Sequence, residues 1–246
     1  MSSLFLRAEK RNGRTVIAES SFTAPLKTAK PFYGDSRTDV ILMAASPGML
    51  DGDSYDITVE VGSGASLCFT GQSYTKVFRA EGQGASQRAK IDLDEDSFLF
   101  YRPMPVIPFE KSVFVGSTEV RLCRGAKFIM YDIMSCGRAA MGERFLFKLY
   151  RTRTSVYVDG RLVFLDNQRL APEEAPLSGI GFFEGRTHAG MMYLYGFSEV
   201  QISDFGEVEL AVSRAREGLC VRAAADSADE IARCFDGIAE LLTKEK

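Results

Sequence analysis

Polar and apolar residues alternate along much of the chain between residues 4 and 165. In the segment 56–61, Ile57, Val59 and Val61 alternate with polar residues, so the three side chains share one face of a strand and are expected in the core. Segments rich in branched and aromatic residues favour further strands. These are expected at 65–70, 97–101, 118–122, 127–134 and 144–150.

The dipeptide Asp159-Gly160 separates two more segments of this kind, 155–158 and 161–164. Both of its positions tolerate a positive φ, as a two-residue hairpin turn requires. The sequence therefore predicts a β-hairpin at this point.

No helical pattern lies between the expected strands, which indicates a mainly β protein of stacked antiparallel or mixed sheets rather than alternating strands and helices. We find no repeat of fixed length in the sequence. An irregular, β-helix-like stack is compatible with this pattern.

The C-terminal segment has a different pattern. Ser227-Ala228-Asp229-Glu230 has the form of a capping box and predicts the start of a helix. Ile231, Phe235, Ile238 and Leu242 form one apolar stripe along it, which favours packing within the chain. The preceding segment 207–214 is compatible with a strand or a helix.

Composition limits the possible functions. The 246 residues fit a single domain, 1–246, and carry 30 basic and 33 acidic side chains without a basic cluster, which argues against nucleic acid as a partner. The five cysteines form no C-x-x-C pair and are expected to be reduced and mostly buried. Without a secretory signal or an apolar run of about 18 residues, the chain is expected to be cytoplasmic and not membrane-bound.

Histidine is scarce, since His188 is the single copy in the sequence. One imidazole excludes a multi-histidine metal centre. The surrounding Gly185–Gly190 segment contains no nucleophile elbow, so a hydrolytic triad is not expected either.

The segment 135–143 places Arg138 and Glu143 between two expected strands, each directly after a glycine. Two interpretations stay open for this pair. The charges form an ion pair that closes a turn, or the sheet rim that carries them is a docking surface.

Two loops carry further candidates. Asp51 and Asp53 lie in the loop 46–53, where turn formation is favoured over cation binding because the ligand series of an EF-hand is absent. The segment 101–109 contains three prolines and is expected to run along an edge or a corner of a sheet, as an apolar protein contact or a buried crossing.

Taken in order, these motifs resemble the UreD (UreH) family of urease accessory proteins. The motifs that carry the resemblance are Lys30-Pro31-Phe32-Tyr33, Ser46-Pro47-Gly48 with Gly52-Asp53, Gln72 with Thr75-Lys76-Val77, Pro103 with Pro105 and Ile107-Pro108-Phe109, and Gly137-Arg138 with Gly142-Glu143. The resemblance implies stacked β-sheets with about two helices toward the C-terminus. It also implies a non-catalytic maturation factor that binds apo-urease, a UreF-like helical partner and a UreG-like GTPase within a hetero-oligomer.

The resemblance further suggests that nickel passes through an internal passage. No tightly bound cofactor is expected, because a conduit needs weak, transient ligands. Candidate nickel ligands, chosen as charged groups near turns, are Asp53, Asp132, Glu143 and His188. Candidate partner-binding residues are Arg138, Glu143, Pro103, Pro105, Ile107, Phe109, Gln72 and Lys76.

Two other functions stay open. One is a carbohydrate-active enzyme that pairs Asp51 or Asp53 with Glu143, although the absence of tryptophan weighs against a sugar-binding cleft. The other is a pure scaffold that joins urease to its partners without passing a metal.

Overall fold

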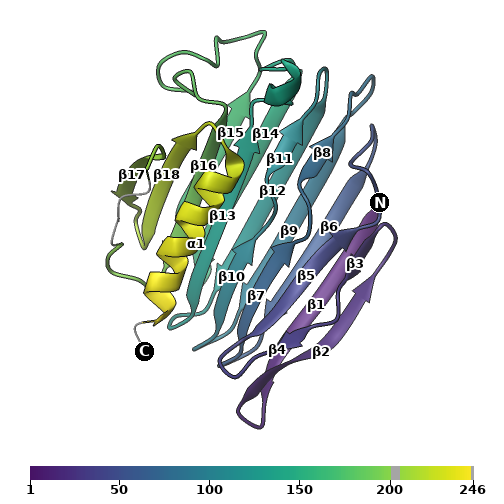
Figure 1. Cartoon of the computed structure of the whole chain (residues 1–246). Coiled ribbons are helices and arrows are strands. Elements are labelled where there is room, and N and C mark those ends of the chain that lie inside the picture. Colours follow the sequence, from purple (N-terminus) through teal and green to yellow (C-terminus); the bar gives the residue numbers. More distant parts are fainter. Residues whose placement is uncertain (201–205, 245–246) are drawn as a thin grey trace.

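Two stacked β-sheets form the body of the protein in the computed structural model, which describes residues 1–200 and 206–244 (Figure 1). Sheet A has the strand order β15 (Arg161–Leu170), β14 (Leu149–Val158), β12 (Val113–Leu122), β9 (Ala85–Leu93), β6 (Ser54–Val61), β1 (Ser2–Arg11) and β2 (Arg14–Phe22). Sheet B has the main order β17 (Glu209–Arg214), β18 (Leu219–Ala225), β16 (His188–Tyr195), β13 (Lys127–Ser135), β10 (Phe98–Arg102), β7 (Ser66–Gly71), β5 (Thr38–Ala44) and β3 (Leu26–Thr28).

Three short strands complete sheet B. The strand β4 (Phe32–Tyr33) pairs with β5, and β11 (Val106–Pro108) pairs with both β8 (Thr75–Val77) and β13. The chain crosses repeatedly from sheet A to sheet B and back, so that β6, β9, β12 and β14 are parallel neighbours in one sheet and β5, β7, β10 and β13 in the other. The predicted mainly β, β-helix-like stack of mixed sheets is therefore confirmed.

The turns of this stack differ in length, which explains why the sequence shows no fixed repeat. The register places Ile57 beside Ala89, Ala89 beside Thr118, and Thr118 beside Thr154, and the number of residues between neighbouring positions differs at each step. The register nevertheless aligns inward-facing apolar residues of successive strands into rows. One such row is completely buried and consists of Leu6, Val59, Ile91, Val120 and Val156.

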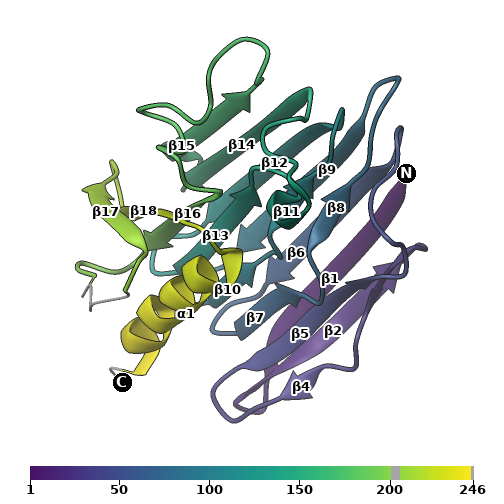
Figure 2. The same ribbon diagram turned by 45° about the horizontal axis from the view of Figure 1, so that its top comes forward.

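A single α-helix, α1 (Ala228–Lys244), covers part of the outer face of sheet B (Figures 1 and 2). Ile231, Phe235 and Ile238 of the predicted stripe are buried, and the ring of Phe235 contacts that of Tyr131 on β13. The predicted helix and its packing within the chain are confirmed. Within the described residues the only other helix is the 3-10 turn η1 (Ala139–Met141), so the expectation of two C-terminal helices is corrected to one.

The hairpin at Asp159-Gly160 is confirmed, and both residues have a positive φ. The segment 209–214 is strand β17. The strand expected at 144–150 is wrong over its first half, because β14 begins only at Leu149. The preceding aromatic residues fill space instead of pairing: Phe147 is buried, and Phe145 packs edge-on against Phe183.

The proline-rich segment lies where the chain turns from sheet B back to sheet A. The corner of the expected edge or corner position is therefore found. The segment does not run along an edge, because its strand β11 is flanked by β8 and, through Val106 and Met134 alone, by β13. The five cysteines are free, and four are buried, as expected. Within the residues described, no helix is long and apolar enough to span a membrane.

Candidate functional site

The interior between the sheets changes from apolar to polar along the strands. One row is the completely buried one that contains Val120. The row next to it ends in small and polar side chains: Ala89, Thr118, Thr154 and Asp166. The following row is polar as well: Gln87, Gly116, Thr152 and Gln168. The next row is apolar again, with the stacked rings of Phe114 and Tyr150. A polar strip thus crosses the strands between two apolar regions.

Three cavities lie along this strip. A small interior cavity of about 40 Å³ is lined by Thr118, Thr152 and Thr154 of sheet A and by Met130 and Asp132 of sheet B. It shares Gln87, Tyr101 and Met104, among other residues, with a cavity of about 70 Å³ at the end where the loop 46–49 lies. Because they share wall residues, these two cavities are neighbours.

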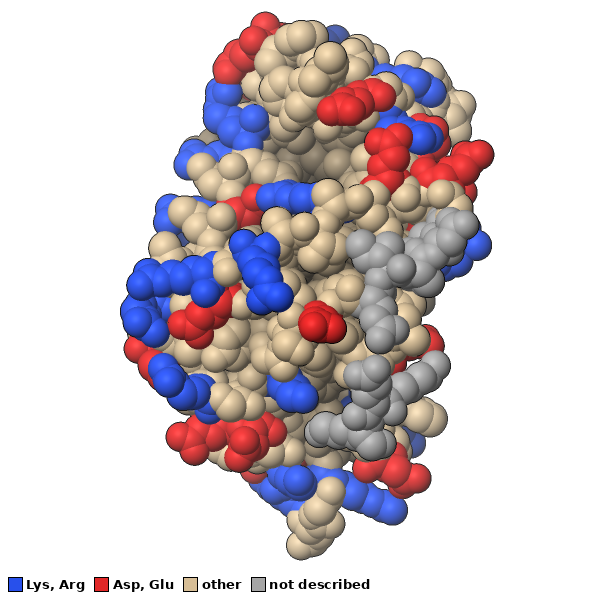
Figure 3. Space-filling view, turned by 90° about the vertical axis from the view of Figure 1, so that its left-hand side faces the viewer, with Lys and Arg blue, Asp and Glu red and all other residues tan. Residues whose placement is uncertain are grey.

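At the other end the strip meets a larger hollow of about 660 Å³ beside β15, β17 and β18. Figure 3 shows this edge of the molecule, with a hollow near the top of the view and acidic and basic side chains around it. Asp132 lines both the hollow and the small interior cavity. The three cavities therefore form a series across the protein, with Asp132 between the last two.

Asp132 lies on β13 and points between the sheets, on the same side of the strand as the core residues Met130 and Met134. Burial, and then the nearby carboxylate of Asp166, raise the pKa of Asp132 to about 6. The guanidinium of Arg222 opposes this shift. Asp132 is thus the candidate nickel ligand that the fold places inside the protein.

The other three candidate nickel ligands lie elsewhere. Asp53 accepts a hydrogen bond from the backbone N–H of Leu50 in its loop, and Glu143 pairs with Arg138. Among the described residues, no group of three or more His, Cys, Asp or Glu side chains could hold a metal ion. A shared site of these four residues is not formed, and their individual roles stay predictions.

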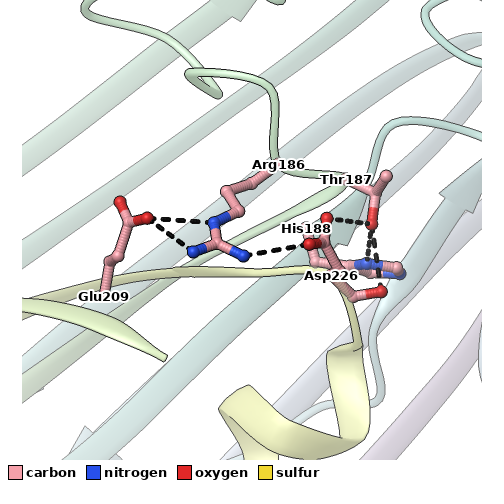
Figure 4. A network of polar contacts seen from close by, with 5 residues as sticks. All are labelled: Arg186, Thr187, His188, Glu209 and Asp226. Atoms are coloured by element: carbon pink, nitrogen blue, oxygen red, sulfur yellow. Dashed lines mark hydrogen bonds and ion pairs between the residues drawn. The ribbon is translucent and has the colours of Figure 1, made fainter. Parts of the chain in front are cut away.

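His188 begins β16 and belongs to a polar network near the start of α1 (Figure 4). Its Nδ1 lies 2.8 Å from the hydroxyl of Thr187, which also donates to the backbone carbonyl of Asp226. Arg186 binds Asp226 and Glu209 in the same network. Burial lowers the pKa of His188. These contacts tie the loop before β16 to β17 and to the start of the helix.

Arg138 and Glu143 form the ion pair that the turn-closing interpretation predicts. The hydrogen bonds from Arg138 lower the pKa of Glu143, and the guanidinium lies 4.3 Å from the ring centroid of Phe109. These contacts bring three of the candidate partner-binding residues together on one surface. Docking at this surface stays a prediction.

The remaining candidate partner residues lie at or near the cavity of about 70 Å³ beside the loop 46–49. Gln72 and Pro103 line it, and Lys76 and Ile107 are register neighbours on β8 and β11. Pro105 is buried, and its carbonyl accepts a hydrogen bond from Thr75. Several motifs that are far apart in the sequence therefore meet at this end.

Glycines allow this close approach. A Cβ on Gly48 would lie 2.6 Å from the backbone oxygen of Lys76, and one on Gly71 would lie 2.7 Å from the side chain of Met104. Asp51 organises the adjacent loop, since its carboxylate accepts hydrogen bonds from the backbone amides of residues 81, 82 and 84. The turn-forming interpretation of Asp51 and Asp53 is confirmed, and the carboxylates considered for sugar hydrolysis all have partners.

The sequence analysis did not find Arg222, which lines the hollow, or Asp166, with which Arg222 forms an ion pair. A regular hairpin at Asp159-Gly160 would have turned Asp166 to the outer face of sheet A. A β-bulge beside Val156 instead pairs Asp166 with Thr154 and turns it inward. The available signal was an acidic residue directly after the apolar run 162–165 of β15.

The fold and this site define a class of protein: an irregular β-helix-like stack with a polar strip through its interior and a helix on one face. The profile of the family described as UreD urease accessory protein matches residues 1–246. The chain belongs to this family of urease accessory proteins.

Individual relatives agree. A urease accessory protein UreD from Acetivibrio thermocellus is 39% identical over 245 residues, covering 94% of this chain and 92% of the relative. A urease accessory protein UreH from Helicobacter acinonychis is 32% identical over 241 residues, covering 95% and 92%. A third, the UreH protein of Helicobacter pylori strain HPAG1, is 33% identical over 241 residues, covering 95% and 91%. The resemblance that the motifs carried is confirmed.

Proposed function

We propose that this protein is a non-catalytic factor in urease maturation that passes nickel through its interior. In this function it binds apo-urease, a UreF-like and a UreG-like accessory protein in the cytoplasm, and it delivers nickel toward the urease active site. Membership of the urease accessory family supports the role in maturation. The series of cavities through the polar strip is the single observation that favours a conduit over a pure scaffold.

The lining of this series suits a metal ion in transit. It offers threonine hydroxyls, the Asp132 carboxylate and the thioethers of Met104, Met130 and Met134, one or two at a time. Nickel binds tightly to clustered imidazole or thiolate ligands, which this lining does not present. An ion that meets weak ligands at successive sites can enter and also leave.

The passage is tested by filling it. Thr118→Leu adds a larger apolar side chain at the small interior cavity, and it should sharply reduce the nickel content of urease in cells that express the urease operon with this variant. The matched control is Glu119→Leu, the next residue on β12, which faces away from the interior and should leave the nickel content unchanged.

Assembly is measured on the same variants by co-purification with urease and the two accessory proteins. We expect both variants to assemble normally. Normal nickel loading with Thr118→Leu would refute the conduit and leave the scaffold. Failure of the unmodified protein to co-purify with any of the three partners would refute the proposed complex.

A further inference from the structure

An ion pair joins the two sheets beside the hollow. Arg222 of β18 in sheet B binds the Oδ1 atom of Asp166 on β15 in sheet A. The strand β15 is the edge strand of sheet A, and β18 lies next to the edge strand β17 of sheet B. Figure 3 views this side of the stack. Arg222 lines the hollow, and so does Asp132.

The surroundings of the pair are also organised. Gln168, two residues further along β15, donates a hydrogen bond of 3.1 Å to the other carboxylate oxygen of Asp166. On sheet B, Asp132, Met191 and Arg222 occupy matching positions on the adjacent strands β13, β16 and β18. Thr154, the register neighbour of Asp166, lines the interior cavity together with Asp132, and the charge of Asp166 raises the pKa of Asp132. Asp132 therefore lies where the hollow meets the interior cavity, Arg222 lies at the hollow, and the carboxylate of Asp166 lies beside them, bound to Arg222.

We propose that Arg222 is an exchangeable counter-ion that gates this end of the passage for a divalent cation. The gate rests on the proposed nickel conduit and names the residues that regulate entry into it. With Arg222 in place, Asp166 is neutralised. When a divalent cation arrives, it repels Arg222 and binds between the carboxylates of Asp132 and Asp166. When the cation moves on, Arg222 returns.

Charge explains why such an exchange is balanced. With both carboxylates ionised, the pair of aspartates carries two negative charges, which match a divalent cation. Without the cation, two like charges in a partly buried space repel each other, and a mobile positive charge relieves that repulsion. An arginine that returns after each ion also prevents the carboxylates from holding the metal permanently.

Exposure explains why Arg222 is the moving partner. Its side chain is 45% exposed, whereas that of Asp166 is 13% exposed and is held by Gln168. A long, half-exposed side chain can turn toward solvent, where water replaces the contacts of its guanidinium. Asp166 stays in place because Gln168 holds its Oδ2 atom. Its Oδ1 atom becomes free for the incoming ion once Arg222 has turned away.

The experiment removes the counter-ion. In Arg222→Met the side chain keeps an unbranched, flexible stem but loses the guanidinium and its charge, so the two carboxylates should bind Ni²⁺ at least about tenfold more tightly. Equilibrium dialysis of the purified full-length protein with Ni²⁺ at pH 7.5 measures this affinity. The nickel content of urease in cells that express Arg222→Met at limiting nickel should fall, because the ion is retained.

Two further variants make the test specific. Arg222→Lys keeps the positive charge and should give affinity and urease loading near those of the unmodified protein. Asp166→Asn leaves Arg222 unpaired beside the entrance, so loading should fall while Ni²⁺ binding becomes weaker. Retention and exclusion are thus separated by the direction of the change in affinity.

The chain supplies a matched control in a second ion pair from β15 toward β18. Arg161 at the start of β15 binds Glu217 in the turn before β18, at a distance of 3.2 Å. Neither residue lines the hollow. Arg161→Met should therefore change neither Ni²⁺ affinity nor urease loading, and thermal unfolding of each variant verifies that it is folded.

The outcomes separate the gate from the conduit. If Thr118→Leu blocks loading but Arg222→Met changes neither affinity nor loading, the gate is wrong and the conduit stands. If Arg222→Met retains Ni²⁺ but Thr118→Leu loads urease normally, the conduit is wrong, and with it a gate on that route. An equal effect of Arg161→Met would also overturn the gate, since any pair between these strands would then suffice.

Discussion

The two halves of the interior are built on the same strands but have opposite properties. In one half, matching positions carry Val59, Ile91 and Val120, and the row is completely buried. Two residues along β12, the equivalent row contains Thr118 and borders a cavity. The backbone pairing is continuous through both rows, so side-chain size and polarity alone decide whether the sheets close on each other or leave a hollow.

This comparison separates stability from function. The apolar rows bury large hydrophobic surfaces, and each buried Val or Ile contributes about 1.5–3 kcal/mol. The polar strip gives up part of that stabilisation and gains a lining with exchangeable ligands. We therefore expect the two halves to respond in opposite ways to the same chemical change.

The largest expected effect comes from placing a carboxylate in each half. Val120→Asp buries a charge in the packed row without a partner and should cost more than about 4 kcal/mol, which is enough to prevent folding. Thr118→Asp, two residues away, places the same group beside a cavity, where it can keep water, and should cost less than about 2 kcal/mol. Soluble yield and urea unfolding measure the two variants. Equal losses would show that the strip is as dry as the core.

The second effect comes from adding a methyl group at a glycine. A Cβ at Gly190 on β16 would lie 2.8 Å from Ile231 and 2.9 Å from the ring of Phe235, both on α1. Gly190→Ala should therefore push the helix from sheet B and lower the free energy of unfolding by roughly 2–3 kcal/mol. Urea unfolding followed by circular dichroism measures the loss.

The matched change in the polar strip is Gly116→Ala on β12. Its Cβ would lie 3.1 Å from both Thr152 and Phe114, so small shifts accommodate it. The reduced entropy of the unfolded chain offsets part of the strain, and the net change should stay within about 1 kcal/mol. If Gly116→Ala were the more damaging variant, the polar strip would be the more tightly packed region.

Sequence patterns predicted the packed half of the interior better than the polar strip. The alternation at Ile57, Val59 and Val61 gave the inward face of β6 directly, and the stripe at Ile231, Phe235 and Ile238 gave the buried face of α1. Both depend on local periodicity, which a single segment contains. The hairpin at Asp159-Gly160 was equally local.

The polar strip depends on register between segments far apart in the sequence. Thr118 and Thr154 become neighbours only because parallel strands of successive turns align. In the antiparallel hairpin of β14 and β15, the bulge beside Val156 decides which face Asp166 occupies. Asp132 was chosen as a candidate ligand for its charge near a turn. It points inward because side chains alternate along β13, and Met130 and Met134, two residues to either side, lie in the core. The first part of the strand expected at 144–150 does not form, because the aromatic residues there fill space without pairing.

The third effect, smaller than that expected at Gly190, concerns the ionisation of Asp132. A buried carboxyl whose pKa is raised from about 3.9 to about 6 binds its proton more tightly in the folded than in the unfolded state. The folded protein therefore loses stability as pH rises from about 4 to about 6, and the loss persists at neutral pH. Asp132→Asn removes this loss and should raise the free energy of unfolding at pH 7.5 by about 1–2 kcal/mol.

The sign of this change distinguishes the two halves of the interior. Most of the gain should disappear at pH 4, where the unmodified Asp132 is protonated in the folded protein. Urea unfolding at both pH values measures it, and Asp56→Asn on the outer face of sheet A, which should stay within about 0.5 kcal/mol, is the control. In the packed half, substitutions lower stability. A gain at Asp132, together with reduced nickel loading of urease, would mean that this carboxylate is retained against the stability of the fold. A loss of stability at pH 7.5 would instead assign Asp132 a structural role.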